Sequence, residues 1–127
     1  MNKITLIVCL LLISTFSFAQ KNIEASSIMK EIKAGNLISY QNATIVGVLD
    51  LTFMEQAIDK IPKKNNWFNW NSGNSTNKIK KIIDIKISFI NCTFKDDVLA
   101  YIPDEDSGYT FTASFENEAI FKNCTFE

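Results

Sequence analysis

The chain has 127 residues, of which 46% are hydrophobic and 21% are charged, and its formal net charge is −1. These values fit a single domain with an apolar core and argue against an intrinsically disordered chain. There is no His, and all 13 basic residues are Lys. The absence of His excludes His-based triads and His metal sites, and the absence of Arg removes the bidentate guanidinium contact with phosphate or carboxylate. The net charge of −1 offers no overall basic surface for binding nucleic acid.

The first 19 residues have the pattern of a secretory signal peptide. Lys3 precedes an apolar run, and Ser17 and Ala19 place small residues at positions −3 and −1 before Gln20. The run is shorter than the roughly 20 residues that a membrane-spanning helix needs. We therefore expect residues 1–19 to be cleaved, the mature protein to be secreted or periplasmic, and no membrane span to remain.

Residues 20–37 are predicted to form a helical N-terminal cap. Ser26 is placed to cap the start of the helix, and Gly35 is placed where a left-handed residue ends it. A helix of this length needs a docking surface to be stable. The apolar residues expected to cover the open end of the following domain are Ile28, Met29, Ile32 and Leu37.

An eight-residue pattern then occurs three times, as ISYQNATI at 38–45, ISFINCTF at 87–94 and AIFKNCTF at 119–126. Large residues recur at alternating steps of five and six, which matches neither a helix nor a plain strand. The large residues predicted to fill the core are Tyr40, Ile45, Leu51, Phe89, Phe94, Phe115, Phe121 and Phe126. Small residues two positions earlier are predicted to form the wall at Ala43, Cys92, Ala113, Ala119 and Cys124.

Asn42, Asn91 and Asn123 stand at the same place in the three copies, directly before the second half of the octet. Asn tolerates turn conformations, so each copy is predicted to be two short strands joined by a bend. Short strands with a bend every five or six residues describe a chain that winds around an apolar centre and stacks in parallel. The pattern therefore predicts a mainly β domain over residues 38–127, a β-solenoid.

The third copy, with Ala119-Ile-Phe-Lys-Asn followed by Cys124-Thr-Phe-Glu, resembles the pentapeptide-repeat family. The resemblance covers 38–52, 85–100 and 111–127 and is similar to Phe-rich, exported bacterial variants of the family. It implies a short right-handed parallel β-helix. The chain departs from the family pattern in its middle positions, its six-residue steps and its two long interruptions.

The interruptions, at about 54–83 and 101–110, are predicted to be loops that leave the wall of the solenoid, where repeat proteins often carry their binding function. The longer one contains aromatic residues flanked by Asn, namely Trp67, Phe68 and Trp70. These side chains are candidates for contact with a sugar or a protein. The alternative is that they pack back onto the wall and anchor the loop.

The shorter interruption contains Asp104-Glu-Asp-Ser-Gly108, which has the alternating oxygen ligands of the start of a calcium loop. The remaining ligands of such a loop are missing, and a solvated acidic turn is the favoured interpretation, with no metal site. Cys92 and Cys124 occupy equivalent positions in consecutive copies, close enough for a disulfide but pointing the same way. Two free thiols are therefore favoured over a bridge.

The predicted function is that of an exported, non-catalytic repeat scaffold, either structural or binding an unknown protein or cell-surface glycan, without cofactor, nucleic acid or metal. One alternative is a β-helix enzyme that cleaves polysaccharides with paired carboxylates. A second is a DNA-mimicking, gyrase-interacting pentapeptide-repeat protein. Because the third copy ends one residue before the end of the sequence, we also expect the repeat array to be truncated at its C-terminus.

Overall fold

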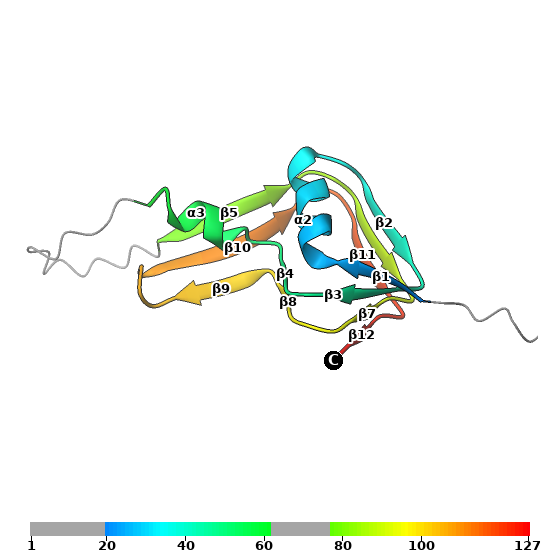
Figure 1. Ribbon diagram of the computed structural model, residues 1–127. Coiled ribbons are helices and arrows are strands. Elements are labelled where there is room, and N and C mark those ends of the chain that lie inside the picture. The colour runs from blue at the N-terminus through cyan, green and yellow to red at the C-terminus, as the bar shows by residue number, and fades with distance from the viewer. Residues whose placement is uncertain (1–19, 62–76) are drawn as a thin grey trace, which may run out of the picture.

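The computed structural model describes residues 20–61 and 77–127, and Figure 1 shows their arrangement. The predicted mainly β fold is confirmed, with most strands in short parallel sheets. The helices are α2 (Ala25–Ala34) and α3 (Met54–Ile58). The strands are β1 (Lys21–Glu24), β2 (Ile38–Gln41), β3 (Ala43–Val46), β4 (Leu49–Asp50), β5 (Lys78–Ile83), β6 (Ile87–Ile90), β7 (Thr93–Phe94), β8 (Val98–Leu99), β9 (Tyr101–Asp104), β10 (Tyr109–Phe115), β11 (Ala119–Lys122) and β12 (Thr125–Phe126).

The three octets lie side by side as parallel neighbours, residue for residue. Their first halves form a sheet in the order β11-β6-β2, and their second halves form a sheet in the order β1-β3-β7-β12. We call residues 38–50, 78–99 and 109–126 layers 1, 2 and 3. The register creates two columns of large side chains, Tyr40–Phe89–Phe121 and Ile45–Phe94–Phe126.

Aromatic rings hold the layers together in these columns. The Phe89 ring lies 5.9 Å from the Tyr40 ring and 5.3 Å from the Phe121 ring, both in stacked orientations. The Phe94 and Phe126 rings stack at 5.0 Å, and Phe89 meets Phe94 edge to face at 5.1 Å. These distances fall in the range where aromatic pairs attract beyond their buried area, so the columns are the centre of the core.

The bend within each octet is made by an asparagine in the left-handed conformation. Asn42, Asn91 and Asn123 have φ angles of 51°, 53° and 52°. A residue with a Cβ atom rarely adopts this conformation, and Asn is among the few types that do so readily. The predicted bend residues are confirmed, and their identical geometry explains why Asn recurs at this position.

The N-terminal segment covers layer 1 in a way that was only partly predicted. β1 adds to the edge of β3, and α2 contacts β1, β2 and β4, as Figure 1 shows. Ile28 and Ile32 are buried, and Gly35 ends the helix at φ 79°. Two expectations are wrong: Glu24, not Ser26, is the N-cap residue, and Leu37 is 67% exposed because it lies past the helix, outside the contact.

Burial of the predicted core residues depends on the layer in which they lie. Among the predicted large residues, those buried to 2% exposure or less are Ile45, Leu51, Phe89 and Phe94, while Tyr40 and Phe115 are half-buried. The prediction that Phe121 and Phe126 are buried is wrong, since they are 37% and 57% exposed. β11 and β12 have a strand neighbour on one side only among the described residues.

The small wall residues follow the same trend. Ala43 and Cys92 are buried at 2% and 1% exposure, whereas Ala113 and Cys124 are half-buried. Ala119 is exposed, contrary to the predicted wall position, because it lies in layer 3, where its strand β11 is at the edge of the sheet.

Both predicted interruptions contain regular structure. The interruption over 54–83 includes α3 and β5, and β5 pairs in parallel with β10. The interruption over 101–110 includes β9, which pairs antiparallel with β10 across a turn. Figure 1 shows this three-stranded sheet, β5-β10-β9, extending away from the octets with α3 beside it.

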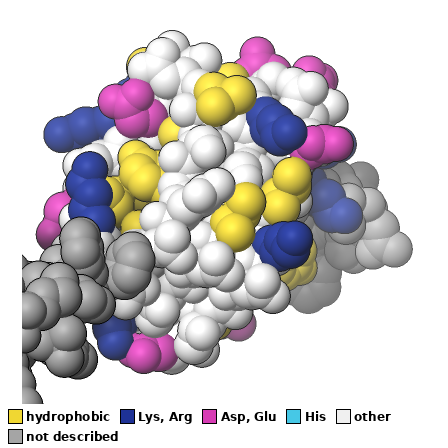
Figure 2. Space-filling view, turned by 90° about the vertical axis from the view of Figure 1, so that its right-hand side faces the viewer, with side chains coloured by type: hydrophobic (Ala, Val, Ile, Leu, Met, Phe, Trp, Pro, Cys, Tyr) yellow, Lys and Arg dark blue, Asp and Glu magenta, His cyan; other side chains and the backbone are white. Residues whose placement is uncertain are grey.

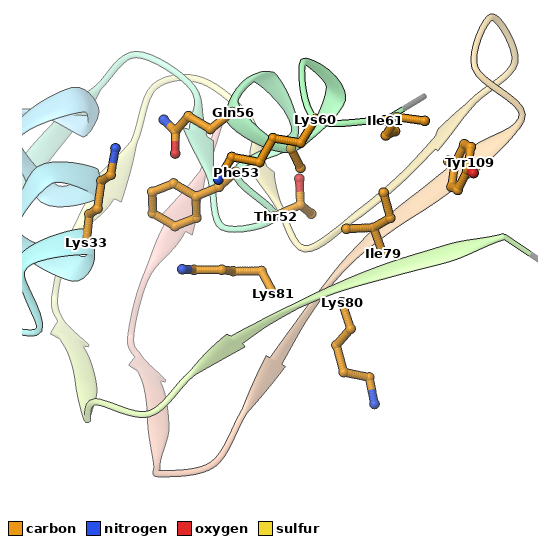
Figure 3. A pocket seen from close by; sticks show the side chains of 11 residues that line it. Lys33, Thr52, Phe53, Gln56, Lys60, Ile61, Ile79, Lys80, Lys81 and Tyr109 are labelled. Atoms are coloured by element: carbon orange, nitrogen blue, oxygen red, sulfur yellow. The ribbon is translucent and has the colours of Figure 1, made fainter. Parts of the chain in front are cut away.

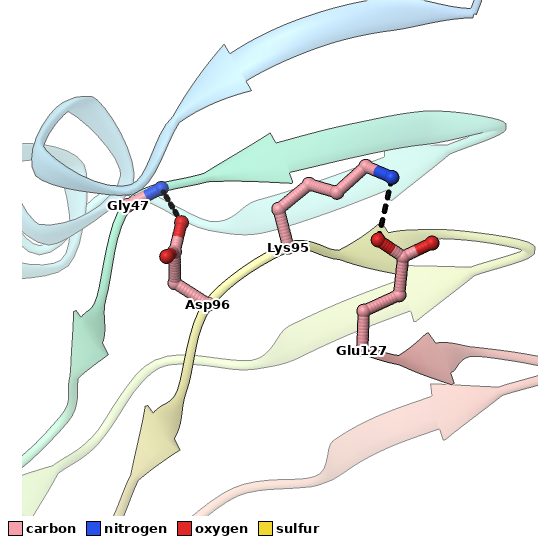
Figure 4. A network of polar contacts seen from close by, with 4 residues as sticks. All are labelled: Gly47, Lys95, Asp96 and Glu127. Carbon is pink, nitrogen blue, oxygen red and sulfur yellow. Dashed lines mark hydrogen bonds and ion pairs between the residues drawn. The ribbon is translucent and has the colours of Figure 1, made fainter.

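Polar contacts tie each layer to the next where the chain leaves the second half of the octet, as Figure 4 shows. The Gly47 N–H of layer 1 donates to the Asp96 carboxylate of layer 2 at 2.7 Å. The Lys95 ammonium of layer 2 contacts the Glu127 carboxylate at 2.5 Å. Both ion-pair partners are about half exposed, so this pair contributes little free energy, and its role is to fix the spacing of the chain ends.

Candidate functional site

The aromatic contact residues predicted from the sequence, Trp67, Phe68 and Trp70, lie outside the described residues. Their role in binding therefore stays a prediction. The described chain ends at Ile61 on one side of this segment and resumes at Asn77 on the other. Ile61 and the nearby Ile79 line the same cavity.

The acidic segment Asp104–Gly108 forms the turn between β9 and β10. The Asp104 carboxylate accepts a hydrogen bond from the Ser107 N–H at 3.1 Å, and the Gly108 N–H donates to the Asp104 carbonyl at 2.9 Å. Within residues 20–61 and 77–127, no group of three His, Cys, Asp or Glu side chains is placed to hold a metal ion. The turn is held by its own hydrogen bonds, as expected of a solvated acidic turn.

Cys92 and Cys124 are free thiols in neighbouring layers. Cys92 Sγ lies 3.4 Å from the Ile90 carbonyl and 3.6 Å from the Tyr40 carbonyl, and Cys124 Sγ lies 3.4 Å from the Phe89 carbonyl. Burial raises the pKa of the Cys92 thiol above its ordinary value, and the neighbouring Cys124 adds to the effect, while backbone hydrogen bonds oppose it. A thiol with a raised pKa is a poor nucleophile, so Cys92 belongs to the core.

Among the described residues, a groove of about 440 Å³ lies between α3 and the sheet of β5 and β10. We call it the wall groove. Figure 3 shows its lining side chains. They come from the end of α2, from the segment around α3 and from the two strands, namely Lys33, Thr52, Phe53, Gln56, Ala57, Lys60, Ile61, Ile79, Lys80, Lys81 and Tyr109.

The turn that leads into α3 fixes one wall of the groove. The Asp50 carboxylate accepts hydrogen bonds from the Thr52 N–H at 2.8 Å, the Thr52 hydroxyl at 2.6 Å and the Met54 N–H at 3.2 Å. Between these contacts Phe53 adopts a left-handed conformation with φ 53° and is 5% exposed. Such a conformation is unfavourable for an aromatic residue and persists only where its surroundings enforce it.

Lys81 occupies an inward position on the opposite wall. Ile79, Lys81 and Ile83 lie on one face of β5, since successive strand residues alternate between faces. These residues are less exposed than their neighbours Lys80 and Ile82 on the other face. In register, Lys81 pairs with Ala113, the small wall residue of layer 3. A charged side chain of layer 2 is thus paired with a small residue of layer 3.

The groove carries an excess of positive charge. Four lysines line it: Lys33, Lys60 and Lys81 lie at the Phe53 end, whereas Lys80 points away from its centre in Figure 3, and none of the four takes part in an ion pair within the described part of the chain. Residues 1–19 and 62–76, which the structure does not describe, contain no Asp or Glu. No lining residue is acidic. The lysines of the groove therefore lack a carboxylate partner from this chain.

A second hollow, of about 350 Å³, lies at the layer 3 end and is lined by Asp96, Asp97, Val98, Phe121, Phe126 and Glu127. It is the open cross-section of the columns described above. Other exposed large apolar residues lie elsewhere on the surface at Leu37, Val48, Ile82 and Tyr101. Figure 2 shows that, on the face it displays, apolar side chains form separate groups among polar and charged ones, not one continuous patch.

Sequence reasoning missed the wall groove because it treated residues 54–83 as a loop without period. The segment Lys78-Ile-Lys-Lys-Ile-Ile83 did contain a signal. Its odd positions read Ile, Lys, Ile, which is the inward face of a strand with one lysine in it. A strand assignment for this segment would have identified Lys81 as a charged residue in a core-facing position.

Helices give no sign of membrane insertion: none among the described residues is long and apolar enough to cross a bilayer. Comparison of the chain with models of protein families, with curated proteins and with solved structures finds no match. The function must therefore be argued from the fold and the groove.

Proposed function

We propose that this protein is an exported, non-catalytic repeat scaffold that binds a ligand in its wall groove. In this proposal the stacked layers form a short right-handed β-solenoid similar to pentapeptide-repeat proteins. The parallel, residue-for-residue pairing of the three octets supports the solenoid, because stacked coils of equal design produce such columns. The signal-peptide pattern of residues 1–19 supports export.

The observation that carries the binding proposal is the inward Lys81. Burying part of a lysine on an otherwise apolar strand face costs free energy, and a repeat scaffold has no structural need for it. The segment between α3 and β5 is also an insertion on the wall, where repeat proteins commonly place their binding residues. A lysine in such a position is suited to ligand contact at the expense of stability.

Binding is favoured over catalysis by the composition of the groove. Its lining contains Lys, Thr, Gln and Tyr but no carboxylate, thiol or imidazole. General acid–base catalysis by paired carboxylates, as in the polysaccharide-cleaving alternative, would need Asp or Glu facing the substrate. The gyrase-interacting alternative would need an extended acidic surface, and the net charge of −1 gives it no support.

Thermal unfolding of the full chain in the presence of ligand panels tests the proposal. The panels are neutral oligosaccharides, acidic oligosaccharides and organic acids, compared on the natural chain and on Lys81→Met. We expect at least one panel to raise the unfolding temperature of the natural chain and to have a smaller effect on the variant. Identical shifts for both proteins, or none, would refute the groove as a binding site. Retention of the chain in the cytoplasm would refute export.

A further inference from the structure

We infer that the ligand of the wall groove is an amphiphilic organic acid, with one anionic head and an apolar body. This inference rests on the proposed binding function and adds the chemical class of the ligand. It follows from three properties of the groove: the separation of charged and apolar side chains along it, the occupied face of Phe53, and the lack of an internal partner for its lysines.

Charge and apolar surface are separated along the groove. In Figure 3 the Lys60 and Lys81 side chains extend toward Phe53, and Lys33 lies at that same end. Ile61, Ile79 and Tyr109 lie toward the opposite end. A ligand that satisfies both ends has an acidic group near the lysines and an apolar body along the isoleucines. The volume of about 440 Å³ lies within the range of about 300–1,000 Å³ that is typical of small-molecule sites.

The state of Phe53 argues against a neutral glycan. Sugars bind proteins by stacking on an open aromatic face, but Lys81 Nζ lies 5.2 Å from the centre of the Phe53 ring, in a cation–π arrangement. Phe53 is also only 5% exposed. Thr52, at 2% exposure, already donates its hydroxyl proton to Asp50. Phe53 and Thr52 are therefore not free to contact a neutral sugar.

The three lysines favour an anion because they repel one another and have no carboxylate partner in this chain, as described above. An acidic head placed among them relieves this repulsion and gains charge-assisted hydrogen bonds. Because Lys81 is half-buried whereas Lys33 and Lys60 are exposed, salt screens the attraction to Lys81 less than the attraction to the other two. Binding should thus weaken with ionic strength without being abolished.

Isothermal titration of the full chain with decanoate tests the inference. Decanol has the same chain without the charge, and acetate has the charge without the chain. We expect decanoate to bind at least about tenfold more tightly than either control, a difference of about 1.4 kcal/mol. Equal binding of decanol would show that the lysines do not contribute, and equal binding of acetate would show that the apolar end does not. Either result overturns the inference.

Lys78 and Lys81 provide a matched pair of variants. Both lie on β5, but Lys81 extends into the groove in Figure 3, whereas Lys78 is exposed and is not among the residues that line the groove. We expect Lys81→Met to weaken decanoate binding by at least about fivefold and Lys78→Met to change it by less than about twofold. Equal losses in both would indicate a general charge effect and contradict a head site at Lys81. Decanol binding to Lys81→Met checks that the groove is intact.

The inference and the broader proposal fail in different ways. If decanoate does not bind, but an acidic oligosaccharide stabilises the natural chain and not Lys81→Met, the groove is a binding site for another class of anion and only the amphiphile is overturned. If neither class gives an effect that depends on Lys81, the proposed binding function is overturned with it.

Discussion

Lys81 and Phe53, which are 28 positions apart in the sequence, meet across the wall groove, with the Lys81 ammonium 5.2 Å from the centre of the Phe53 ring. Phe53 comes from the turn before α3, and Lys81 comes from the inward face of β5. This contact joins the two sides of the long interruption. It also places the Lys81 cation between Ile79 and Ile83 on the inward face of β5, which leads to the first prediction.

Replacing Lys81 by Met should make the folded chain more stable by about 0.5–1 kcal/mol. The loss of a partly exposed cation–π contact, worth a similar amount, is outweighed because Met places apolar surface between Ile79 and Ile83 and relieves repulsion among the groove lysines. Urea unfolding followed by circular dichroism measures the change. A clear loss of stability would show that Lys81 is a structural residue and would weaken the case for ligand binding.

Replacing Asn91 by Ala should destabilise the chain by about 1–2 kcal/mol, the cost of holding a residue with a Cβ atom in the left-handed conformation. Asn91 is exposed, so little packing is lost. Asn91→Gly is the control, because Gly adopts this conformation without strain. Denaturant midpoints of the two variants give the comparison. Equal stability of the Ala and Gly variants would mean that the bend geometry does not explain the recurring asparagines.

Position in the stack should decide how much an aromatic residue contributes. Phe89→Ala removes a fully buried ring from layer 2 and should cost about 3–5 kcal/mol, enough to unfold much of the population. Phe126→Ala removes a ring that is 57% exposed, and it should cost less than about 1.5 kcal/mol. Equilibrium unfolding of both variants tests the difference. Similar losses would indicate that Phe126 is covered in solution.

The two thiols should differ in reactivity. Cys124 is half-buried, whereas Cys92 is 1% exposed and burial raises its pKa. With a disulfide reagent at mildly alkaline pH, Cys124 should be modified first and Cys92 only at rates set by unfolding. Because the folded state keeps Cys92 protonated above the pH at which an unfolded thiol ionises, stability should fall as pH rises through that range. Variants with Ser at each position assign the two rates.

The octets were the predictable part of this fold. Large residues at steps of five and six, with Asn at each bend, were sufficient to place Phe89 and Phe94 in the core and to predict a bend at each asparagine. The pattern lies within eight consecutive residues and occurs three times, so it is unlikely to arise by chance. The exposure of Phe121 and Phe126 could not be derived in this way, because burial depends on which strands lie beside a residue and not on the residue's own pattern.

The wall groove could not be predicted from the sequence pattern either, because it too depends on which elements lie side by side. Its lining comes from the end of α2, the turn before α3 and two strands, so no single stretch of sequence contains it. Only Lys81 carried a local signal, as a lysine between two isoleucines on one strand face. Lys33 and Phe53 become part of the site through the docking of α2 and α3, which the repeat pattern does not determine.

The register of the octets tolerates different lengths of chain between the copies. The copies that start at residues 38 and 87 are 49 positions apart, and those that start at 87 and 119 are 32 apart, yet both pairs align without a slip. Loop-closure entropy grows only with the logarithm of length, so the longer separation costs only about 0.4 kcal/mol more to close. The stretch of chain between α3 and β5 can therefore be lengthened or shortened at little cost in loop-closure free energy, while the columns of Phe89 and Phe94 stay as they are.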